Sequence, residues 1–311
     1  MEGDERTAAP TALRGRRLGL NLRPSSGRPL ARLVAEWGDG HRRDFPWRDT
    51  RDPWWVLVSE IMLQQTQAAR VVTPFERFVT RFPTPVACAA AEVGDVVRAW
   101  GGLGYNRRAV FLHRAARRIV EDYAGAVPAD LADLRSLPGV GEYTARAVLA
   151  FAFEHDVAVV DTNVRRVVSR ALAGRVVSAA EVQELADSLV PPGSAWAHNQ
   201  AMLDLGAAHC TATPSCAGCP TRGRCAWAAA GWSEPDPARP PGATRPLRFA
   251  GSDRQGRGRL VAELRARAVA RTELAQVAGW PDDEARARRV ADGLVADGLA
   301  RWVEERALAL A

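Results

Sequence analysis

Lysine is absent from the sequence, and all 42 of its basic residues are arginine. This absence excludes chemistry in which a lysine ε-amino group attacks a substrate to form a Schiff base. Long apolar runs are also missing: no stretch reaches the roughly 18 uncharged apolar residues that a membrane-spanning helix needs, so we expect no membrane span. The N-terminus has no apolar segment followed by a cleavage site, which argues against a secretory signal.

Cysteine is scarce, with five residues among 311, but four of the five fall within one short segment. They are Cys210, Cys216, Cys219 and Cys225, with the spacing C-x5-C-x2-C-x5-C. Such clustering is typical of a metal site and not of a secreted disulfide framework. It therefore predicts that the protein resides in the reducing cytoplasm. The net charge of +6 and the pI near 9.6 favour an anionic partner.

Composition divides the chain into four parts. Residues 1–28 mix Gly, Pro, Ser, Thr and Arg without periodicity, which predicts a disordered basic tail. Residues 29–230 show helical periodicity and few β-branched alternations, which predicts an all-α domain. Residues 231–250 contain five prolines, as a linker does. The pattern in 251–311, three helices and a hairpin, resembles a winged-helix module; the alternative is a small helical cap.

A turn punctuated by glycine, Leu137-Pro138-Gly139-Val140-Gly141, separates two helical patterns. Pro138 ends the first helix, because proline cannot continue an α-helix, and the second helix begins near Glu142. Gly139 and Gly141 let the backbone approach a partner closely, and the amides at the following helix N-terminus point outward. This geometry predicts phosphate binding.

Two carboxylates occupy positions where burial would perturb them. Asp161 follows a buried-looking run, 157–160, and precedes an arginine-rich helix, so we expect it to cap that helix and face a site. Glu60 lies in a helical pattern from Trp54 to about Val72 and shares its apolar face. An apolar helix face raises the pKa of a carboxyl from its usual value of about 4.3, as a general acid working near neutrality requires.

Together these motifs resemble the helix-hairpin-helix glycosylase superfamily, and within it the MutY-type adenine DNA glycosylases. The resemblance covers roughly residues 30 to 228. It rests on the cysteine cluster and on LPGVGEYTA (137–145), VVDTNVRRV (159–167), SEIMLQQTQ (59–67), GGLGY (101–105) and HNQAMLDLGA (198–207). The fold it implies has a six-helix part at about 50–160 and an iron–sulfur part formed by 29–49 with 161–230.

The function implied by the resemblance is repair of double-stranded DNA by base excision. The enzyme would flip an adenine that is mispaired with 8-oxoguanine or guanine and hydrolyse its N-glycosidic bond with acid catalysis. Glu60 is the expected general acid and base, which protonates the adenine ring. Asp161 would stabilise the oxocarbenium-like sugar, or form a transient adduct with its anomeric carbon. Tyr143 would buttress Asp161, and Asn163 would orient the same group or the attacking water.

Tyr143 also bears on the type of glycosylase. Bifunctional relatives such as endonuclease III carry a lysine at this position, and that lysine cleaves the strand through a Schiff base. Because the chain has no lysine, we expect a monofunctional glycosylase without this lyase activity.

Further positions match residues that contact DNA in the family. Gln64, Gln65 and Tyr105 would enter the duplex and fill the gap left by the flipped nucleotide, with Thr66 and Leu103 near the orphaned base. Polar and aromatic wedges of this kind offset part of the lost base stacking.

Three more residues, Trp47, Arg48 and Gln200, match positions that line the adenine pocket in the family, although Trp47 alone would more often be a core aromatic. The chain departs from the family at Asn106, where a second tyrosine is usual. Many MutY-type enzymes also read 8-oxoguanine with a C-terminal nudix-like domain, for which residues 251–311 are too short.

The resemblance predicts a 4Fe-4S cluster held by the thiolates of the four clustered cysteines. Their first interval is one residue shorter than the x6 that is usual in the family, and tetrahedral zinc is the alternative. The cluster would be structural and would stiffen a loop that presents Arg222 and Arg224 to phosphate. Cys88, outside this set, is expected in the core.

Two other functions stay open. A mismatch thymine or uracil glycosylase on the same scaffold would share the tyrosine and the aspartate but typically lacks Glu60. A non-catalytic iron–sulfur DNA-binding regulator would need neither Glu60 nor Asp161. In each case we expect a cytoplasmic, nucleoid-associated monomer that binds duplex DNA and no membrane.

Overall fold

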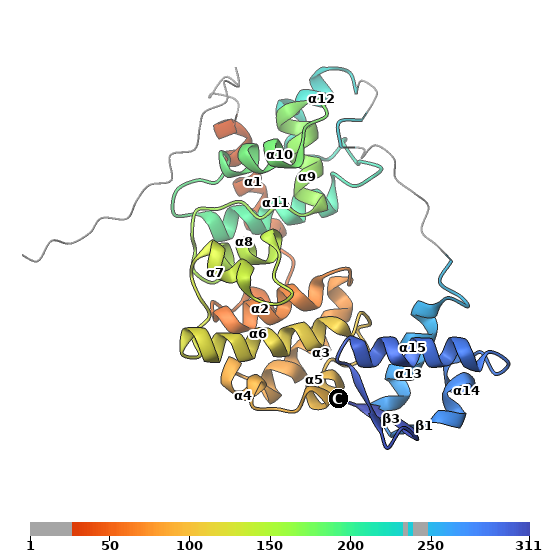
Figure 1. Ribbon diagram of the computed structural model, residues 1–311. Helices are drawn as coiled ribbons and strands as arrows, with labels where there is room; N and C mark the ends of the chain where they lie inside the picture. The colour runs from red at the N-terminus through yellow and green to blue at the C-terminus, as the bar shows by residue number, and fades with distance from the viewer. Residues whose placement is uncertain (1–26, 233–235, 239–247) are drawn as a thin grey trace, which may run out of the picture.

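The computed structural model describes residues 27–232, 236–238 and 248–311 (Figure 1). The tail predicted for 1–28 lies outside the described residues, except that Gly27 and Arg28 form the first turn of α1 (Gly27–His41). Most of the linker predicted for 231–250 also lies outside them. In the described part of the chain, no helix is long and apolar enough to cross a membrane.

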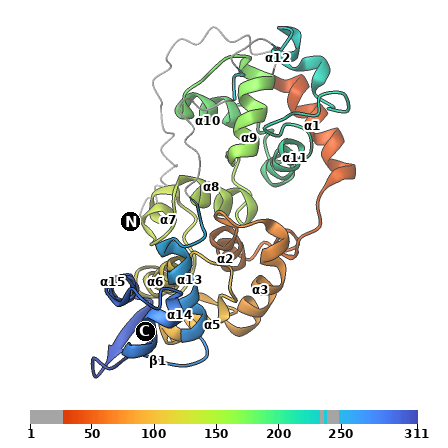
Figure 2. The same cartoon turned by 90° about the vertical axis from the view of Figure 1, so that its right-hand side faces the viewer.

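The all-α prediction for 29–230 is confirmed, and the helices form two groups that face each other (Figures 1 and 2). The first group is α2 (Pro53–Leu63), α3 (Ala68–Arg81), α4 (Pro85–Ala89), α5 (Val93–Ala99), α6 (Arg107–Tyr123), α7 (Leu131–Ser136) and α8 (Glu142–Phe151). The second group is α1, α9 (Thr162–Val167), the π-helical turn η2 (Val168–Ala173), α10 (Ala179–Asp187), α11 (Ala195–Ala208), η3 (Arg222–Arg224) and α12 (Ala226–Ala229). The short turn η1 (Pro46–Arg48) lies on the segment that connects α1 to α2.

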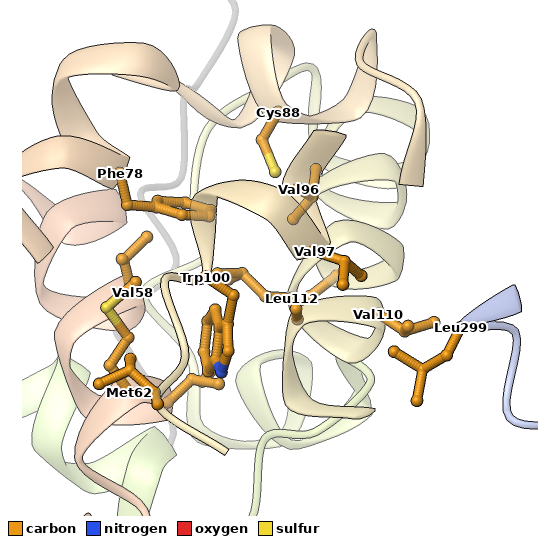
Figure 3. Close-up of a cluster of buried hydrophobic side chains, with 14 of the residues drawn as sticks. Val58, Met62, Phe78, Cys88, Val96, Val97, Trp100, Val110, Leu112 and Leu299 are labelled. Carbon is orange, nitrogen blue, oxygen red and sulfur yellow. The ribbon is translucent and has the colours of Figure 1, made fainter. Parts of the chain in front are cut away.

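Each group has its own hydrophobic core. In the first group, Phe78, Trp100 and Leu112 are fully buried and pack against α2 residues such as Met62 (Figure 3). Cys88 belongs to this core, as expected. The second core is smaller and joins α1 to α9, η2, α10 and α11. Because the two cores are separate, residues at their boundary can form a cleft.

The helix predicted from Trp54 to about Val72 is wrong in one respect: it is broken between Leu63 and Ala68. Gln65 has a φ of +54° there, which is outside helical geometry. The reason is a contact that is distant in sequence. Arg108 on α6 donates to the carbonyls of Ile61 and Met62, both at 2.9 Å, and so satisfies groups that a continuing helix would have bonded to its next turn.

The C-terminal module, residues 251–311, combines three helices with a small sheet. Its elements are α13 (Asp253–Leu264), β1 (Val269–Ala270), η4 (Arg271–Glu273), α14 (Leu274–Ala278), α15 (Glu284–Ala296), β2 (Ala300–Val303) and β3 (Ala307–Leu310). The strands are antiparallel in the order β1-β3-β2, with Trp302 opposite Leu308. The predicted hairpin is therefore β2-β3, and β1 adds a strand that the sequence pattern did not indicate. The winged-helix interpretation stays a prediction.

Candidate active site between the two helical groups

A cleft of about 940 Å³ lies at the boundary between the two groups of helices. Ten of the predicted site residues line it: Trp47, Arg48, Glu60, Gln64, Gln65, Thr66, Tyr143, Asp161, Asn163 and Gln200. They come from η1, α2, the 64–67 connection, α8, α9 and α11. Leu103, Tyr105, Gly139, Gly141 and the four clustered cysteines lie elsewhere.

Glu60 is a buried carboxyl on α2, with 5% of its surface exposed. Its Oε2 atom has no hydrogen-bond partner among the described residues. Burial raises the pKa of Glu60 from 4.5 to about 7, against the opposing effects of a hydrogen bond with Tyr143 and the charge of Arg48. At neutral pH a large fraction of Glu60 therefore holds a proton that it can transfer to a group entering the cleft.

Asp161 caps the N-terminus of α9, as the sequence predicts. Its two carboxylate oxygens accept hydrogen bonds from Val164 N and Asn163 Nδ2, each at 2.7 Å. Burial raises the pKa of Asp161, and these hydrogen bonds oppose that effect. With both oxygens engaged, the carboxylate has one orientation, facing the cleft that Glu60 also lines.

Tyr143 lies in the first turn of α8, where the charges of both Glu60 and Asp161 act on its phenol. Burial, together with the charges of Glu60 and Asp161, raises the pKa of Tyr143 well above its usual value, so the phenol keeps its proton. The hydrogen bond of Tyr143 is with Glu60. The support of Asp161 by Tyr143 therefore stays a prediction, and the contact of Tyr143 with Glu60 is one that the sequence did not indicate.

A chain of hydrogen bonds joins Asp161 to the cysteine segment. Asn163, which donates to Asp161, accepts from Arg166 Nη2 at 2.5 Å, and Arg166 Nε donates to the carbonyl of Cys210 at 2.5 Å. The helix α11 approaches this chain so closely that a Cβ atom on Gly206 would lie 2.8 Å from Asn163. The position of Asp161 therefore depends on the packing of α9 against α11.

Sequence reasoning missed a buried ion pair behind the cleft. Arg48 donates two hydrogen bonds to Asp204, Nη1 to Oδ2 at 2.7 Å and Nη2 to Oδ1 at 2.9 Å, and Arg43 Nε adds a third at 2.6 Å. Burial alone would raise the pKa of Asp204, but the hydrogen bonds and charge of Arg48 outweigh it and lower that pKa. An aspartate in the middle of the apolar stretch LDLGA was the signal that could have revealed this pair.

Trp47 and Gln200, predicted for the adenine pocket, are both buried walls of the cleft, with 7% and 5% of their surface exposed. Trp47 stacks on Phe45 at a centroid distance of 4.9 Å and also belongs to the hydrophobic core. Its side chain is therefore a core aromatic and also a wall of the cleft, and its place in an adenine pocket stays a prediction.

The two predicted wedge segments, 64–67 and 101–106, are joined by Arg108. Its guanidinium donates to the Gln64 carbonyl, to Thr66 Oγ1 at 3.1 Å and to the Gly104 carbonyl at 3.2 Å. Tyr105 projects from this pair of segments with 47% of its surface exposed, while Leu103 is buried. An exposed aromatic ring on a braced loop is a suitable wedge for a base stack.

In the glycine-punctuated turn before α8, Gly139 and Gly141 are exposed, whereas Leu137 and Val140 are buried. Gly139 has a φ of +81°, and a Cβ atom there would lie 2.8 Å from Phe111 Cβ, so no other residue fits without movement. A Cβ atom on Gly141 would meet nothing in the chain, which leaves the approach to the α8 amides open. Gln64 Nε2 donates to the Gly139 carbonyl at 3.3 Å and so links the turn to the cleft.

The four clustered cysteines line one cavity together with Arg170. Within the described residues, no three or more His, Cys, Asp or Glu side chains form a group that could hold a metal ion. Arg170 Nη1 lies 3.5 Å from Cys210 Sγ; burial raises the pKa of Cys210, and Arg170 opposes that effect. Four thiols and a buried cation around one cavity are a donor set that fits an anionic, thiolate-bound cluster. Arg222 and Arg224 lie exposed on the same loop.

Comparison with known proteins gives concordant results. Residues 58–192 match the family described as HhH-GPD superfamily base excision DNA repair protein. The adenine DNA glycosylase of Mycolicibacterium smegmatis is 44% identical over 285 residues, which cover 89% of this chain and 94% of that protein. Among solved structures, a thermostable thymine-DNA glycosylase is 30% identical, with a TM-score of 0.61, and covers 66% of this chain and 97% of its own. An endonuclease III in a non-covalent complex with DNA is 25% identical, with a TM-score of 0.59, over 68% of this chain and 99% of its own.

Proposed function

Because this chain belongs to the HhH-GPD superfamily of base excision DNA repair proteins, with adenine DNA glycosylases among its relatives, we propose that it removes adenine mispaired with 8-oxoguanine or guanine from double-stranded DNA. The observation that carries the proposal is the burial of Glu60, which keeps a proton on a carboxyl near neutral pH. Adenine is a poor leaving group until its ring is protonated, so its removal needs such an acid. Neither DNA binding nor a structural role would need it.

In the proposed reaction, Glu60 transfers its proton to a ring nitrogen of the flipped adenine. The bond between this base and the sugar C1′ then breaks, and its electron pair leaves with the base. Asp161, whose two oxygens accept hydrogen bonds that favour its anionic form, stabilises the positive charge that develops on the sugar. Water adds to C1′ and gives its proton to the Glu60 carboxylate, which restores the acid and leaves an abasic site. A transient Asp161 adduct at C1′ is the alternative route.

The cleft has the dimensions of a pocket for a flipped base. Its volume of about 940 Å³ falls within the range of ordinary ligand pockets, and Trp47 and Gln200 supply an apolar wall and an amide for an adenine edge. Arg48 is committed to Asp204, so we propose that it fixes the wall and does not itself read the base. Tyr105 and Gln65 would fill the space that the base leaves in the duplex.

The turn at Gly139 and Gly141 would hold the DNA backbone. The N-terminus of α8 has no side-chain cap, so its first amides would offer hydrogen-bond donors and a positive dipole end to a phosphate. Exposed arginines, including Arg222 and Arg224 on the cysteine loop, would add sequence-independent attraction that weakens with salt.

We propose that Cys210, Cys216, Cys219 and Cys225 hold a 4Fe-4S cluster. When bound, the cluster would supply rigid cross-linking of the loop and no step of the hydrolysis. Arg170, which also pairs with Asp236, would donate through Nη1 to the Cys210 thiolate, and Arg166 connects the loop to Asn163 and hence to Asp161. Five residues separate the first two cysteines, one fewer than is usual in the family. The proposal is that this shorter interval still allows the cluster, because all four cysteines line the same cavity.

The domain division belongs to the proposal as well. It comprises a glycosylase domain over 29–230 and a winged-helix-like module over 251–311, joined by the linker. The order helix, strand, helix, helix, strand, strand in the module supports the winged-helix interpretation.

Single-turnover release of the base, with strand scission by alkali as the readout, tests the function. The substrates are duplexes with A opposite 8-oxoguanine, G, C or T, and duplexes with T or U opposite G. We expect adenine release opposite 8-oxoguanine and G, abolished in Glu60→Gln. Glu142→Gln is the matched control, because Glu142 also lines the cleft but is exposed and paired with Arg146. Release of T or U without release of adenine would refute the proposal and favour a mismatch pyrimidine glycosylase.

A further inference from the structure

The C-terminal module packs directly on α5 and α6 of the first group of helices (Figure 2). The amide of Gly94 on α5 donates to the carbonyl of the last residue, Ala311, at 2.7 Å, and a Cβ atom on Gly94 would lie 2.8 Å from that oxygen. Leu299 faces Val110 of α6 (Figure 3), and the hydrophobic core runs without interruption from the helices into the module. The module is therefore not a loosely tethered attachment.

One side chain of the module reaches the wedge loop, residues 101–106. Arg265, the C-cap of α13, donates through Nη2 to Asn106 Oδ1 at 2.7 Å and through Nε to the Val97 carbonyl at 3.3 Å. Asn106 directly follows Tyr105 and stands where the family usually has a second tyrosine. Here its side chain supplies the acceptor for Arg265.

The wedge loop needs external contacts to keep its shape. Gly101, Gly102, Gly104 and Tyr105 all have φ between +46° and +81°, and for tyrosine this region is costly. From inside the protein, Trp100 Nε1 and Arg108 Nη2 each donate to the Gly104 carbonyl at 3.2 Å. The module adds contacts from another direction: Arg265 bonds Asn106, and its Nη1 would lie 4.0 Å from a Cβ atom on Gly102.

We propose that Arg265 is a positioning residue for the known reaction class: it holds the wedge loop in the conformation from which Tyr105 enters the duplex. The module thereby becomes part of the base-flipping machinery while its own arginine need not touch the flipped base. This inference rests on the proposed function, because insertion of Tyr105 presupposes a base-flipping enzyme. A second contact, Arg107 Nε to Asp297 Oδ1 at 3.4 Å, ties the start of α6 to the module just beyond the loop.

The test measures insertion and chemistry separately. A duplex with A opposite 8-oxoguanine carries 2-aminopurine beside the lesion, so that loss of stacking upon insertion raises its fluorescence; base release is followed under single-turnover conditions with saturating enzyme. The variants are Arg265→Ala, Asn106→Ala, Tyr105→Ala and the double variant Arg265→Ala/Tyr105→Ala. The matched control is Arg267→Ala, since Arg267 is an exposed arginine whose ion pairs, among the residues that the structure describes, are with Glu263 and Glu273 of its own module.

We expect Arg265→Ala and Asn106→Ala to slow insertion and base release to a similar extent, by about tenfold, and Arg267→Ala to stay within about twofold of wild type. In the Tyr105→Ala background, Arg265→Ala should not slow insertion or base release further, because the side chain that Arg265 positions is then missing. An additive loss would overturn the inference, since it would mean that Arg265 acts by general stability.

An unchanged insertion signal in both Arg265→Ala and Asn106→Ala would also overturn it. Asn106→Ala keeps the test valid if Arg265→Ala fails to fold. Failure of the proposed function has a different signature: the wild-type enzyme would release no adenine, whatever the variants do to the fluorescence.

Discussion

The pH dependence of adenine release is set by the environment of Glu60, and its size can be worked out. The active form is the one in which Glu60 is protonated. With a pKa of about 7, roughly ten in eleven molecules are in this form at pH 6 and roughly one in eleven at pH 8. The single-turnover rate should therefore fall by about tenfold between these two pH values, and by tenfold per unit above them.

The assay is base release with enzyme in saturating excess over an A·8-oxoguanine duplex, at constant ionic strength, from pH 5.5 to 9. With enzyme in excess, product release does not limit the measured rate. A binding titration at each pH checks that the duplex is fully bound, so that changes in affinity do not contribute to the rate. Glu60→Gln should be inactive throughout, and Glu142→Gln should follow the wild-type profile. A wild-type rate that is constant within about twofold from pH 6 to 8.5 would refute the reasoning, because the burial of Glu60 would then not control its proton.

Three further predictions concern the cleft and the cysteine cavity. Gly206→Ala would force the new Cβ atom against Asn163, displace Asp161 and lower the single-turnover rate by about tenfold or more with little change in DNA affinity, whereas Gly40→Ala, where a Cβ meets nothing, should be neutral. Arg48→Met would leave Asp204 paired with Arg43 alone and lower the free energy of unfolding in urea by an amount on the order of 3 kcal/mol. It should also move the midpoint of the pH–rate profile upward, because Arg48 lowers the pKa of Glu60. An unmoved midpoint would show that the two groups are not coupled. Cys216→Ala should lose bound iron and sulfide in elemental analysis and weaken DNA binding, and full retention of iron would contradict the cluster proposal.

Much of the site could be predicted because its signals are local. The cap at Asp161, the turn before α8 and the apolar face around Glu60 are each encoded within one or two helical turns of sequence. The break at 64–67 could not be predicted in the same way, because it depends on Arg108, more than forty positions away in the chain. The Arg48–Asp204 pair spans an even longer separation, and periodicity says nothing about which buried charges meet.

The same limit applies to the C-terminal module. Its β2-β3 hairpin is a contact between neighbours in sequence and was predicted, whereas β1 consists of only two residues and exists as a strand because β3 pairs with it. The contact between Arg265 and Asn106 joins two domains of the predicted scheme, and a departure from the family at Asn106 was the only sign of it. Substitutions of this kind become interpretable once the partner residue is known.

The absence of lysine acquires a structural meaning from these contacts. Arg108 donates to carbonyl or hydroxyl oxygens at the end of α2, in the 64–67 connection and in the wedge loop at the same time. A planar guanidinium with five donors can hold three segments in fixed relative positions, whereas a lysine ammonium is a single point on a flexible stem. Arg166 acts in the same manner between Asn163 and Cys210, and Arg265 links α5 to the wedge loop. The arginines that made the composition basic are thus, in part, internal connectors of the site, and net charge alone overstates how many of them are free to meet DNA.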